Sequence, residues 1–240
     1  MSSPIILIDS ENECGYLDLI IGPMFSGKTE FLLRELNIFS IMGANVLYVN
    51  HELDTRGDIF STHNPSLLNT SITFHNKKLK TAKDILDYSN DYLVIGIDEA
   101  QFFDDEIVAV CNDLANQGIR VIVAGLDMDY MGRPFEPMPH LLAIAEHVTK
   151  LHAICAESGM IANFSQRIVD KSDRVLVGET DSYEPRARHC FRPPVDSRKG
   201  RPIKPMIGTI TPKPQENEEE RNEEREKGRG RHANQRSTCS

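Results

Sequence analysis

One segment of eight residues constrains this chain more than any other part of its sequence. Residues 22–29 fit the pattern G-x-x-x-x-G-K-[ST], in which a glycine-rich loop wraps around phosphate groups. An apolar run at 17–21 precedes the loop and helix-forming residues at 30–36 follow it, which is the strand–loop–helix setting that such a loop requires. The plain alternative is a turn before an ordinary helix, but chance alone produces the full pattern in only about one chain in a hundred. We therefore expect the chain to bind a nucleoside triphosphate.

The residue types in this loop match the chemistry of a triphosphate. Glycine lets backbone N–H groups approach the phosphate oxygens, the Lys28 ammonium can reach the outer phosphates, and the Thr29 hydroxyl can bind magnesium. The residues expected to form the loop are Gly22, Pro23, Met24, Phe25, Ser26, Gly27, Lys28 and Thr29.

Hydrophobic segments alternate with amphipathic ones along the body of the chain. The sequence predicts strands at 17–21, 46–50, 93–98, 119–126 and 147–154, and helices at 28–42, 84–88, 104–117 and 138–145. Apolar strands separated by helices predict an α/β fold, in which helices flank both faces of a parallel sheet. Such sheets bind ligands at the carboxyl ends of their strands, which is where Gly22, Asp98 and Leu126 fall.

The composition narrows the class of protein further. Hydrophobic residues make up 40% of the chain, but no apolar run approaches the length of a membrane span, so we expect a soluble globular protein with no membrane partner. Segment 4–8 is too short for a signal peptide, and the five cysteines lack the spacing of a disulfide framework. These two features predict a cytoplasmic location.

The charge is distributed unevenly along the chain. Residues 201–240 carry nine Lys/Arg and seven Asp/Glu, a net charge of +2, so the chain total of −9 leaves −11 on residues 1–200. An acidic body argues against a nucleic-acid-binding surface, which needs a basic stripe. Segment 215–236 has almost no apolar residues to offset the entropy of ordering, so we predict a disordered tail. The Arg-Gly run at 228–231 is a weak signal for RNA contact, and a solvated tail is the simpler interpretation.

Two adjacent carboxylates follow the apolar segment 93–97. Asp98 stands where P-loop proteins hold magnesium, either directly or through water. Glu99 points in a different direction from its neighbour and suits general-base catalysis on an attacking hydroxyl or water molecule. A helix cap is the plain alternative, but Asp104 and Asp105 already stand at the start of the helix that follows. The chain lacks the N-K-x-D motif that reads guanine, which weakens a GTPase interpretation.

Several motifs in a fixed order resemble the type II thymidine kinases. They are GPMFSGKT at 22–29, DTR at 54–56, IDEAQFF at 97–103 and the loop at 126–135, followed by Gly178, Tyr183 and Cys190. The GPMFSGKT and DEAQFF pair is specific to that family, and the resemblance covers residues 14–192. It implies a P-loop (RecA-like) ATP domain with a small C-terminal lobe of lasso or zinc-ribbon type. The implied parts are an N-terminal extension (1–13), the ATP-binding α/β domain (14–153), a lobe that covers the nucleoside (154–192) and a disordered mixed-charge tail (193–240).

The resemblance implies a kinase that transfers the γ-phosphate of ATP to the 5′-hydroxyl of deoxythymidine, giving dTMP for DNA synthesis by nucleotide salvage. It also implies a homotetramer, feedback inhibition by dTTP, and Mg²⁺ as the ion that accompanies ATP. Glu99 matches the base that accepts the hydroxyl proton. Lys28 and Arg56 match groups that steady charge on the transferring phosphoryl group, while Thr29 and Asp98 match the magnesium ligands.

The remaining matches concern the two binding pockets. On the nucleotide side, the resemblance adds Asp54, Thr55, Arg56, Asp98 and Gln101. On the nucleoside side, it implies a pocket formed by Met24, Phe102, Leu126, Tyr130, Arg174, Val175, Leu176, Val177, Gly178 and Tyr183. Tyr130 stands where the family commonly has Phe, so its hydroxyl needs a partner or access to water. The plain alternatives are a surface-turn role for Arg56 and ordinary core packing for the apolar residues.

The structural zinc site of the family is incomplete in this chain. The family pattern is C-x-x-C followed about 30 residues later by a second C-x-x-C, which together hold a tetrahedral zinc ion. The corresponding positions here are Cys155, Ser158, Ala187 and Cys190. Because serine and alanine cannot supply thiolates, we expect no four-cysteine zinc, and a site completed by His152 or His189 is the alternative. Without zinc, the two cysteines would pack as a small apolar pair, able to oxidise if their Cα atoms lie close enough.

Two other classes of function stay open at the level of the sequence. One is a motor-type or regulatory ATPase, in which Glu99 activates water instead of a nucleoside; steady ATP hydrolysis without nucleoside would favour it. The other is a catalytically idle nucleotide-binding scaffold that acts through its tail, for which replacing Glu99 would leave biological activity unchanged.

Overall fold

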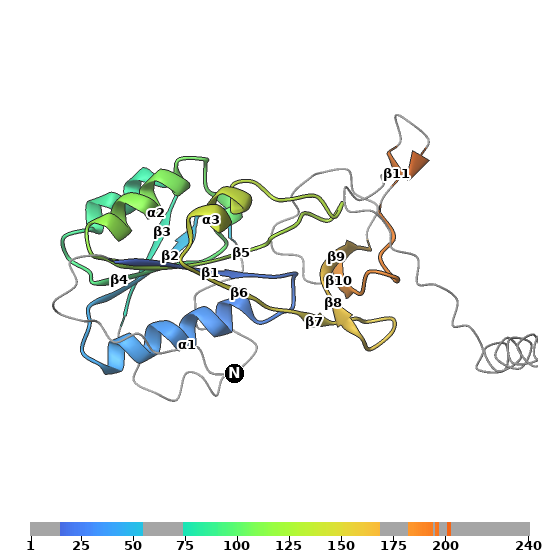
Figure 1. Cartoon of the computed structure of the whole chain (residues 1–240), viewed down its shortest axis with the longest axis horizontal. Helices are drawn as coiled ribbons and strands as arrows, with labels where there is room; N and C mark the ends of the chain where they lie inside the picture. Colours follow the sequence, from blue (N-terminus) through green and yellow to red (C-terminus); the bar gives the residue numbers. More distant parts are fainter. Residues whose placement is uncertain (1–14, 55–73, 169–181, 194, 197–200, 203–240) are drawn as a thin grey trace, which may run out of the picture. The chain divides into compact units, whose positions relative to one another are not determined.

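A six-stranded parallel sheet forms the centre of the described structure. The computed structural model describes residues 15–54, 74–168, 182–193, 195–196 and 201–202, all within a compact unit that spans Met1–Met206 (Figure 1). The strand order is β3-β2-β4-β5-β1-β6, and every neighbouring pair is parallel. The strands are β1 (Tyr16–Ile21), β2 (Val46–His51), β3 (His75–Leu79), β4 (Val94–Ile97), β5 (Arg120–Gly125) and β6 (His147–Lys150). The predicted α/β fold with a parallel sheet is confirmed.

The central strands are apolar because both faces of the sheet are covered. Successive side chains of a strand point to opposite faces, so Leu17, Leu19 and Ile21 of β1 join one buried cluster while Ile20 joins another. Strands β2 and β4 are buried along their whole length, and β5 is buried except for Arg120. A continuous apolar run of this kind is typical of a strand inside a parallel sheet.

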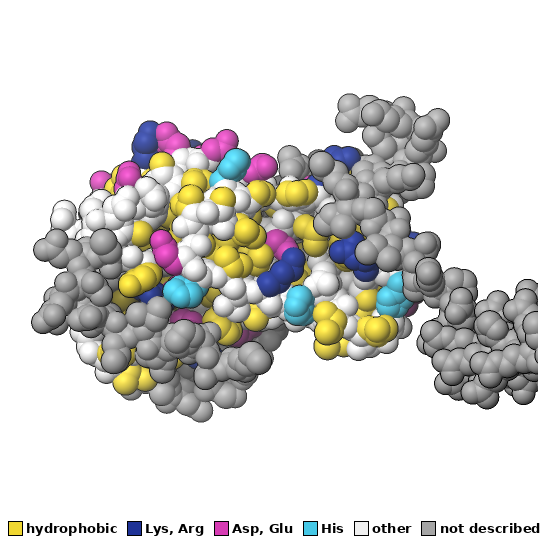
Figure 2. All heavy atoms as spheres, in the orientation of Figure 1, with side chains coloured by type: hydrophobic (Ala, Val, Ile, Leu, Met, Phe, Trp, Pro, Cys, Tyr) yellow, Lys and Arg dark blue, Asp and Glu magenta, His cyan; other side chains and the backbone are white. Residues whose placement is uncertain are grey.

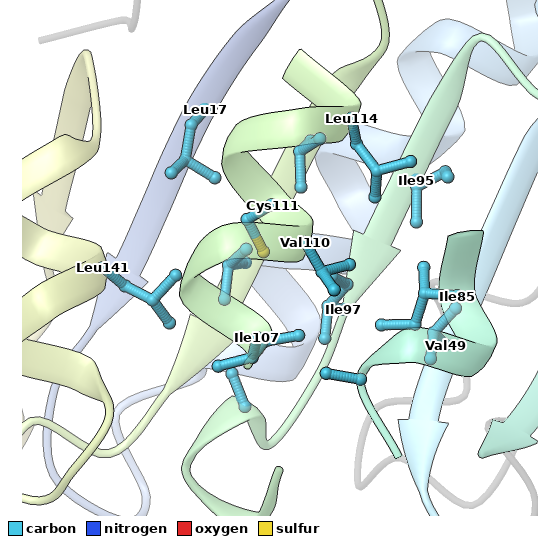
Figure 3. Close-up of a cluster of buried hydrophobic side chains, with 14 of the residues drawn as sticks. Leu17, Val49, Ile85, Ile95, Ile97, Ile107, Val110, Cys111, Leu114 and Leu141 are labelled. Atoms are coloured by element: carbon cyan, nitrogen blue, oxygen red, sulfur yellow. The ribbon is translucent and has the colours of Figure 1, made fainter. Parts of the chain in front are cut away.

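Helices cover the two faces of the sheet (Figure 1). On one face, α1 (Lys28–Ile41) buries Leu32, Leu36 and Phe39 against the sheet, at the spacing of one helix face. The opposite face carries α2, α3 and a short 3-10 helix, η3, which pack on the larger cluster shown in Figure 3. Their bounds are Ile107–Asn116 for α2, Met138–Ile144 for α3 and Lys83–Tyr88 for η3.

The two edges of the main sheet differ from the elements that the sequence predicts. Segment 147–154 is not one strand, because β6 ends at Lys150 and the chain then enters a separate two-stranded sheet at Ala153. The sequence also gave no sign of β3, which pairs only with β2 at the edge of the sheet and has no apolar face.

Two small antiparallel hairpins follow the main sheet. The first pairs β7 (Ala153–Ile154) with β8 (Ile161–Ala162), and the second pairs β9 (Phe164–Arg167) with β10 (Tyr183–Arg186). A further short pair joins β11 (Val195–Asp196) and β12 (Arg201–Pro202). The hairpins have their own buried cluster of small side chains, which consists of Ala153, Cys155, Ala162, Ala187 and Cys190.

The surface of the described residues mixes charges of both signs. On the face drawn in Figure 2, acidic and basic side chains are interspersed with apolar ones over the sheet domain. Among the described residues, no helix has the length and hydrophobicity needed to cross a bilayer.

Candidate functional site

The predicted phosphate loop joins β1 to α1 at the carboxyl edge of the sheet. Its backbone takes left-handed dihedral angles at Phe25 (φ 65°) and at Gly27 (φ 79°), and the helix begins at the next residue, Lys28. The Lys28 ammonium donates a hydrogen bond of 2.9 Å to the carbonyl of Pro23, and the Ser26 hydroxyl donates one of 2.8 Å to the same oxygen. The loop therefore closes around the lysine, at the positive end of the α1 dipole, which favours an anion.

Gly22 is required by a close backbone contact as well as by its conformation. Its φ is 155°, and a Cβ atom at this position would lie 2.5 Å from the carbonyl oxygen of Leu151. Leu151 follows the edge strand β6 and donates its N–H to the carbonyl of Ile21. The start of the phosphate loop is thus packed against the segment that leaves the sheet for the hairpins.

Asp98 lies beside the phosphate loop, at the end of β4. The Thr29 hydroxyl donates a hydrogen bond of 2.7 Å to Oδ2 of Asp98, and the backbone N–H of Glu99 donates one of 2.9 Å to Oδ1. Asp98 is only 1% exposed. The structure therefore brings together the two residues that the sequence predicts as magnesium ligands, although they are far apart in the chain.

Tyr48 is a member of this cluster that the sequence analysis missed. Its hydroxyl, which comes from β2, donates a hydrogen bond of 3.0 Å to Oδ2 of Asp98. Burial raises the pKa of Tyr48 well above its ordinary value, and the charge of Asp98 raises it further, so the hydroxyl keeps its proton and acts as a donor. A tyrosine in an apolar strand is indistinguishable from a core residue in the sequence, and only the pairing of β2 with β4 reveals its role.

Glu99 has a strained backbone and a fixed side chain. It adopts left-handed dihedral angles (φ 52°, ψ 43°) just before the short 3-10 helix η4 (Ala100–Phe102), and it is 5% exposed. The side-chain amide of Gln101 donates a hydrogen bond to the Glu99 carboxylate, while its oxygen accepts one of 2.9 Å from the N–H of Leu126. Strain of this kind at a non-glycine residue is a frequent feature of functional sites. Gln101, predicted as a nucleotide contact, here connects Glu99 to the loop after β5.

Asp54 is the described member of the predicted 54–56 motif. Its carboxylate accepts a hydrogen bond of 2.8 Å from the side-chain amide of Asn50, the residue near the end of β2 that also faces this edge of the sheet. Thr55 and Arg56, together with the predicted base-covering segment 174–178, lie outside the described residues. Their roles stay predictions.

The predicted nucleoside pocket draws residues from the sheet domain and from the second hairpin. The backbone N–H of Met24 donates a hydrogen bond of 2.9 Å to the hydroxyl of Ser165 on β9. Tyr130 lies in the loop after β5, and the guanidinium carbon of Arg167 lies 3.7 Å from its ring centroid. The same guanidinium donates a hydrogen bond of 2.7 Å to the Tyr183 hydroxyl. The sequence analysis did not single out Ser165 or Arg167, since neither belongs to a motif.

Phe102 and Leu126 are the other two described residues that the sequence predicts for the nucleoside pocket. Phe102 ends η4 and its ring lies 6.3 Å, between centroids, from the ring of His51. Leu126 begins the loop after β5, whose shape is held by two N–H groups that donate to the carboxylate of Asp129, those of Met131 (2.8 Å) and Arg133 (3.0 Å).

Three of the four positions that correspond to the family's zinc ligands lie in the hairpin cluster, and the fourth, Ser158, bonds to two of them. Cys155 and Cys190 are buried thiols that form no disulfide, and Ala187 packs with them. Burial alone would raise the pKa of Cys155, but the Ser158 hydroxyl and the N–H groups around it donate hydrogen bonds to the thiol and lower its pKa to about 6. Burial raises the pKa of Cys190, even though the Ser158 hydroxyl also bonds to that thiol.

Ser158 therefore bridges two thiols at the position where the family pattern has a third. Within the described part of the chain, no three His, Cys, Asp or Glu side chains gather closely enough to hold a metal ion. The residues present do not fit a four-thiolate zinc site, because a hydroxyl and a methyl group occupy two of its corners.

Comparison with known proteins identifies the family. Residues 15–191 match the family described as thymidine kinase. The thymidine kinase of Rhodothermus sp. (strain ITI 518) is 46% identical over 204 residues, which cover 84% of this chain and 92% of that protein. The thymidine kinase of Bacteroides thetaiotaomicron is 46% identical over 180 residues, or 74% of this chain and 87% of that one. That of Porphyromonas gingivalis is 42% identical over 184 residues, or 74% and 85%.

A solved structure gives a more distant likeness. The flagellar accessory protein FlaH from Methanocaldococcus jannaschii superposes with a TM-score of 0.44 at 16% identity, over 65% of this chain and 79% of that chain. The identification comes from the sequence matches, which extend over the phosphate loop, the Asp98–Glu99 pair and the hairpins alike. This chain belongs to the thymidine kinase family.

Proposed function

We propose that this protein transfers the γ-phosphate of ATP to the 5′-hydroxyl of deoxythymidine, with Glu99 as the general base. The observation that carries the proposal is the contact between Thr29 and Asp98, because it sets the residue after Asp98 beside the phosphate loop. Membership of the thymidine kinase family supports the substrate. In this arrangement Glu99 accepts the proton of the 5′-hydroxyl group. The 5′-oxygen of the nucleoside then bonds to the γ-phosphorus while the bond from that phosphorus to the ADP oxygen breaks.

Lys28 and the phosphate loop supply the electrostatic part of the reaction. Negative charge on the bridging and γ-phosphoryl oxygens is stabilised by the lysine ammonium and by N–H groups at the start of α1. Because these donors are already in place before the reaction, little reorganisation is needed in the transition state. We propose the same supporting role for Arg56, which lies outside the described residues.

A magnesium ion fits the oxygen donors at the Thr29–Asp98 contact. Magnesium prefers carboxylate, hydroxyl and phosphate oxygens, and the Asp98 carboxylate is held in place by the Tyr48 hydroxyl and the N–H of Glu99. When bound, the ion would supply charge neutralisation at the β- and γ-phosphate oxygens. Asp98 and Thr29 would hold it.

The wider family properties belong to the same proposal. We expect Met24, Phe102, Leu126, Tyr130 and Tyr183, together with residues 174–178, to surround the thymine base. The division at 14–153 and 154–192, a cytoplasmic homotetramer and feedback inhibition by dTTP are proposed with it.

The test is a transfer assay with γ-labelled ATP against a panel of the four deoxynucleosides and a reaction without nucleoside. We expect labelled dTMP as the main product and only slow release of phosphate when nucleoside is absent. Steady hydrolysis without nucleoside, and no labelled nucleotide, would point to an ATPase in which Glu99 activates water. A different preferred deoxynucleoside would overturn the substrate.

A further inference from the structure

Arg167, at the end of β9, is a buried charged residue that touches two aromatic rings of the proposed pocket. It is 8% exposed, and its guanidinium carbon lies 3.7 Å from the Tyr130 ring centroid and 5.3 Å from the Tyr183 ring centroid. Its Nη2 atom donates a hydrogen bond of 2.7 Å to the Tyr183 hydroxyl. The two rings come from different elements, the loop after β5 and strand β10.

The planar guanidinium suits this double contact better than any other side chain. It can stack its face on the Tyr130 ring while its edge donates to the Tyr183 hydroxyl. A lysine ammonium would keep the attraction to a ring but has no flat face to stack and no fork of donors in a fixed plane. The group is also removed from water, which strengthens both contacts. Its contacts therefore connect the Tyr130 ring to the Tyr183 ring.

Strand β9 also contacts the phosphate loop through the same set of alternating residues. Ser165 is two residues before Arg167, and its hydroxyl accepts the hydrogen bond from the N–H of Met24. Side chains at alternate positions of a strand point to the same face. One face of β9 thus meets the phosphate loop at Ser165 and the pocket rings at Arg167. The opposite face carries Phe164, whose ring stacks on that of Phe191 with centroids 4.4 Å apart.

We propose that Arg167 is a positioning residue for the nucleoside: it holds the Tyr130 and Tyr183 rings at a fixed separation and so determines how tightly the deoxynucleoside binds. The inference rests on the proposed function, because it requires both rings to face the nucleoside. It assigns Arg167 no part in phosphoryl transfer itself. If Arg167 had a purely structural role in the β9–β10 hairpin, its replacement would lower stability and would not raise the KM for thymidine more than the KM for ATP.

The test is to separate the two KM values and kcat in a short series of variants. In Arg167→Met, we expect the KM for thymidine to rise roughly tenfold or more, because a stacking contact and a charged hydrogen bond are lost together. The KM for ATP and kcat should stay within about twofold of the wild-type values, since the phosphate loop is unchanged. Arg167→Lys should restore part of the nucleoside affinity.

A double-variant cycle tests whether the effect passes through the tyrosine. Tyr183→Phe removes only the hydroxyl that accepts the hydrogen bond, so we expect the KM for thymidine to rise less than it does in Arg167→Met. In Arg167→Met/Tyr183→Phe the two effects should combine to less than their product, because both single changes break the same contact. Independent effects would show that Arg167 does not act through Tyr183.

A matched control is available in the same hairpin. Arg186 on β10 forms ion pairs with Glu157 and Glu184 and has a side chain that is 18% exposed. Arg186→Met removes a partly buried arginine without touching either ring, so we expect an unchanged KM for thymidine whatever it does to the melting temperature.

The possible results distinguish a failure of the inference about Arg167 from a failure of the proposed function. An unchanged KM for thymidine in Arg167→Met, or equal rises in both KM values, would overturn the inference and leave the kinase function intact. If Arg167→Met does not fold, Arg167→Lys and Tyr183→Phe carry the test, and wild-type KM values in both would overturn it. A wild-type protein that cannot phosphorylate thymidine would overturn the proposed function first and the inference with it.

Discussion

Asp98 accepts hydrogen bonds from two side chains that are distant in the sequence and from the backbone of its own neighbour. They come from the Thr29 hydroxyl on α1, the Tyr48 hydroxyl on β2 and the N–H of the next residue, Glu99. Three donors around one buried carboxylate fix its orientation, which is the support that a metal-binding carboxylate needs.

Asp98→Asn should raise the magnesium concentration needed for half-maximal activity by about 10- to 100-fold. The amide has the same shape and its one oxygen can still accept from the Thr29 and Tyr48 hydroxyls, so the fold should survive while the charge and the second acceptor are lost. A magnesium titration of the initial rate measures the effect. Asp113→Asn, on the exposed side of α2, is the matched control. Superimposable titrations for Asp98→Asn and the wild type would remove Asp98 from the metal site.

Glu99→Gln should lower kcat by roughly 10²- to 10⁴-fold, because the amide cannot accept the proton of the attacking hydroxyl. The KM for ATP should change little, since no phosphate contact is lost. Steady-state kinetics in both substrates measure the two values. Glu106→Gln removes an exposed carboxylate that pairs with Lys83 and should leave both unchanged. Retention of wild-type kcat in Glu99→Gln would assign the base to another residue.

The hairpin elements bring four ligand positions together although only two still carry thiols. The turn that follows Cys155 and the turn from Ala187 to Cys190 are each closed by backbone hydrogen bonds, and Ser158 bonds to the thiols of Cys155 and Cys190. This is the arrangement of a zinc knuckle with a hydroxyl in one corner and a methyl group in another.

Restoring the two missing thiols should restore metal binding. We expect Ser158→Cys/Ala187→Cys to hold one zinc ion per chain, because Cys155, Ala187 and Cys190 already lie in one cluster and Ser158 bonds to both thiols. Elemental analysis of untagged protein measures the content, and a chelator should lower the melting temperature of the double variant only. Stoichiometric zinc in the unaltered protein would contradict this account and point to His152 or His189 as a substitute ligand.

Cys155, which follows β7, should make the stability of the protein depend on pH. The pKa of Cys155 is lowered from 9.0 to about 6 on folding, so the folded state prefers the thiolate. Its contribution to stability is therefore complete above pH 9 and is lost as the pH falls toward 6. The melting temperature should fall over this interval, and the slope should flatten in Cys155→Ala. Cys111→Ala, which removes a buried thiol with a pKa of about 12, should lower stability without changing the slope. Equal slopes in all three proteins would contradict the assignment.

Elements with a strong apolar pattern could be predicted from the sequence, and those held by pairing alone could not. Strands β2, β4 and β5 are buried on both faces, so their sequences are continuous apolar runs. In contrast, β3 reads His-Asn-Lys-Lys-Leu and is a strand only because β2 offers it an edge.

The residues of the candidate site also differ in whether the sequence predicts them. The phosphate loop, Asp98 and Glu99 are carried by local motifs and could be predicted. The contributions of Tyr48, Ser165 and Arg167 depend on which strands lie side by side, and no local pattern marks them.

At the scale of the whole molecule, the nucleoside should stabilise the fold because its proposed pocket joins the sheet to the second hairpin. Thymidine at 100 times its dissociation constant should add about 2.7 kcal/mol to the free energy of unfolding, provided that it binds only the folded state. Thermal unfolding at increasing thymidine concentrations measures the shift, with deoxycytidine as the control. A melting temperature that does not change with the thymidine concentration would contradict a nucleoside pocket between the sheet and the second hairpin.

The position of β1 in the sheet has a consequence for how the protein is made. β1 is the first strand of the sheet, yet its two neighbours are β5 and β6, which begin at Arg120 and His147. A ribosome working from the amino terminus therefore releases the phosphate loop long before the strands that support it. Gly22 meets its packing partner only when Leu151 has emerged. Until β5 has been synthesised, the apolar strand β1 has no partner in the nascent chain, and an exposed segment of this kind is what chaperones bind.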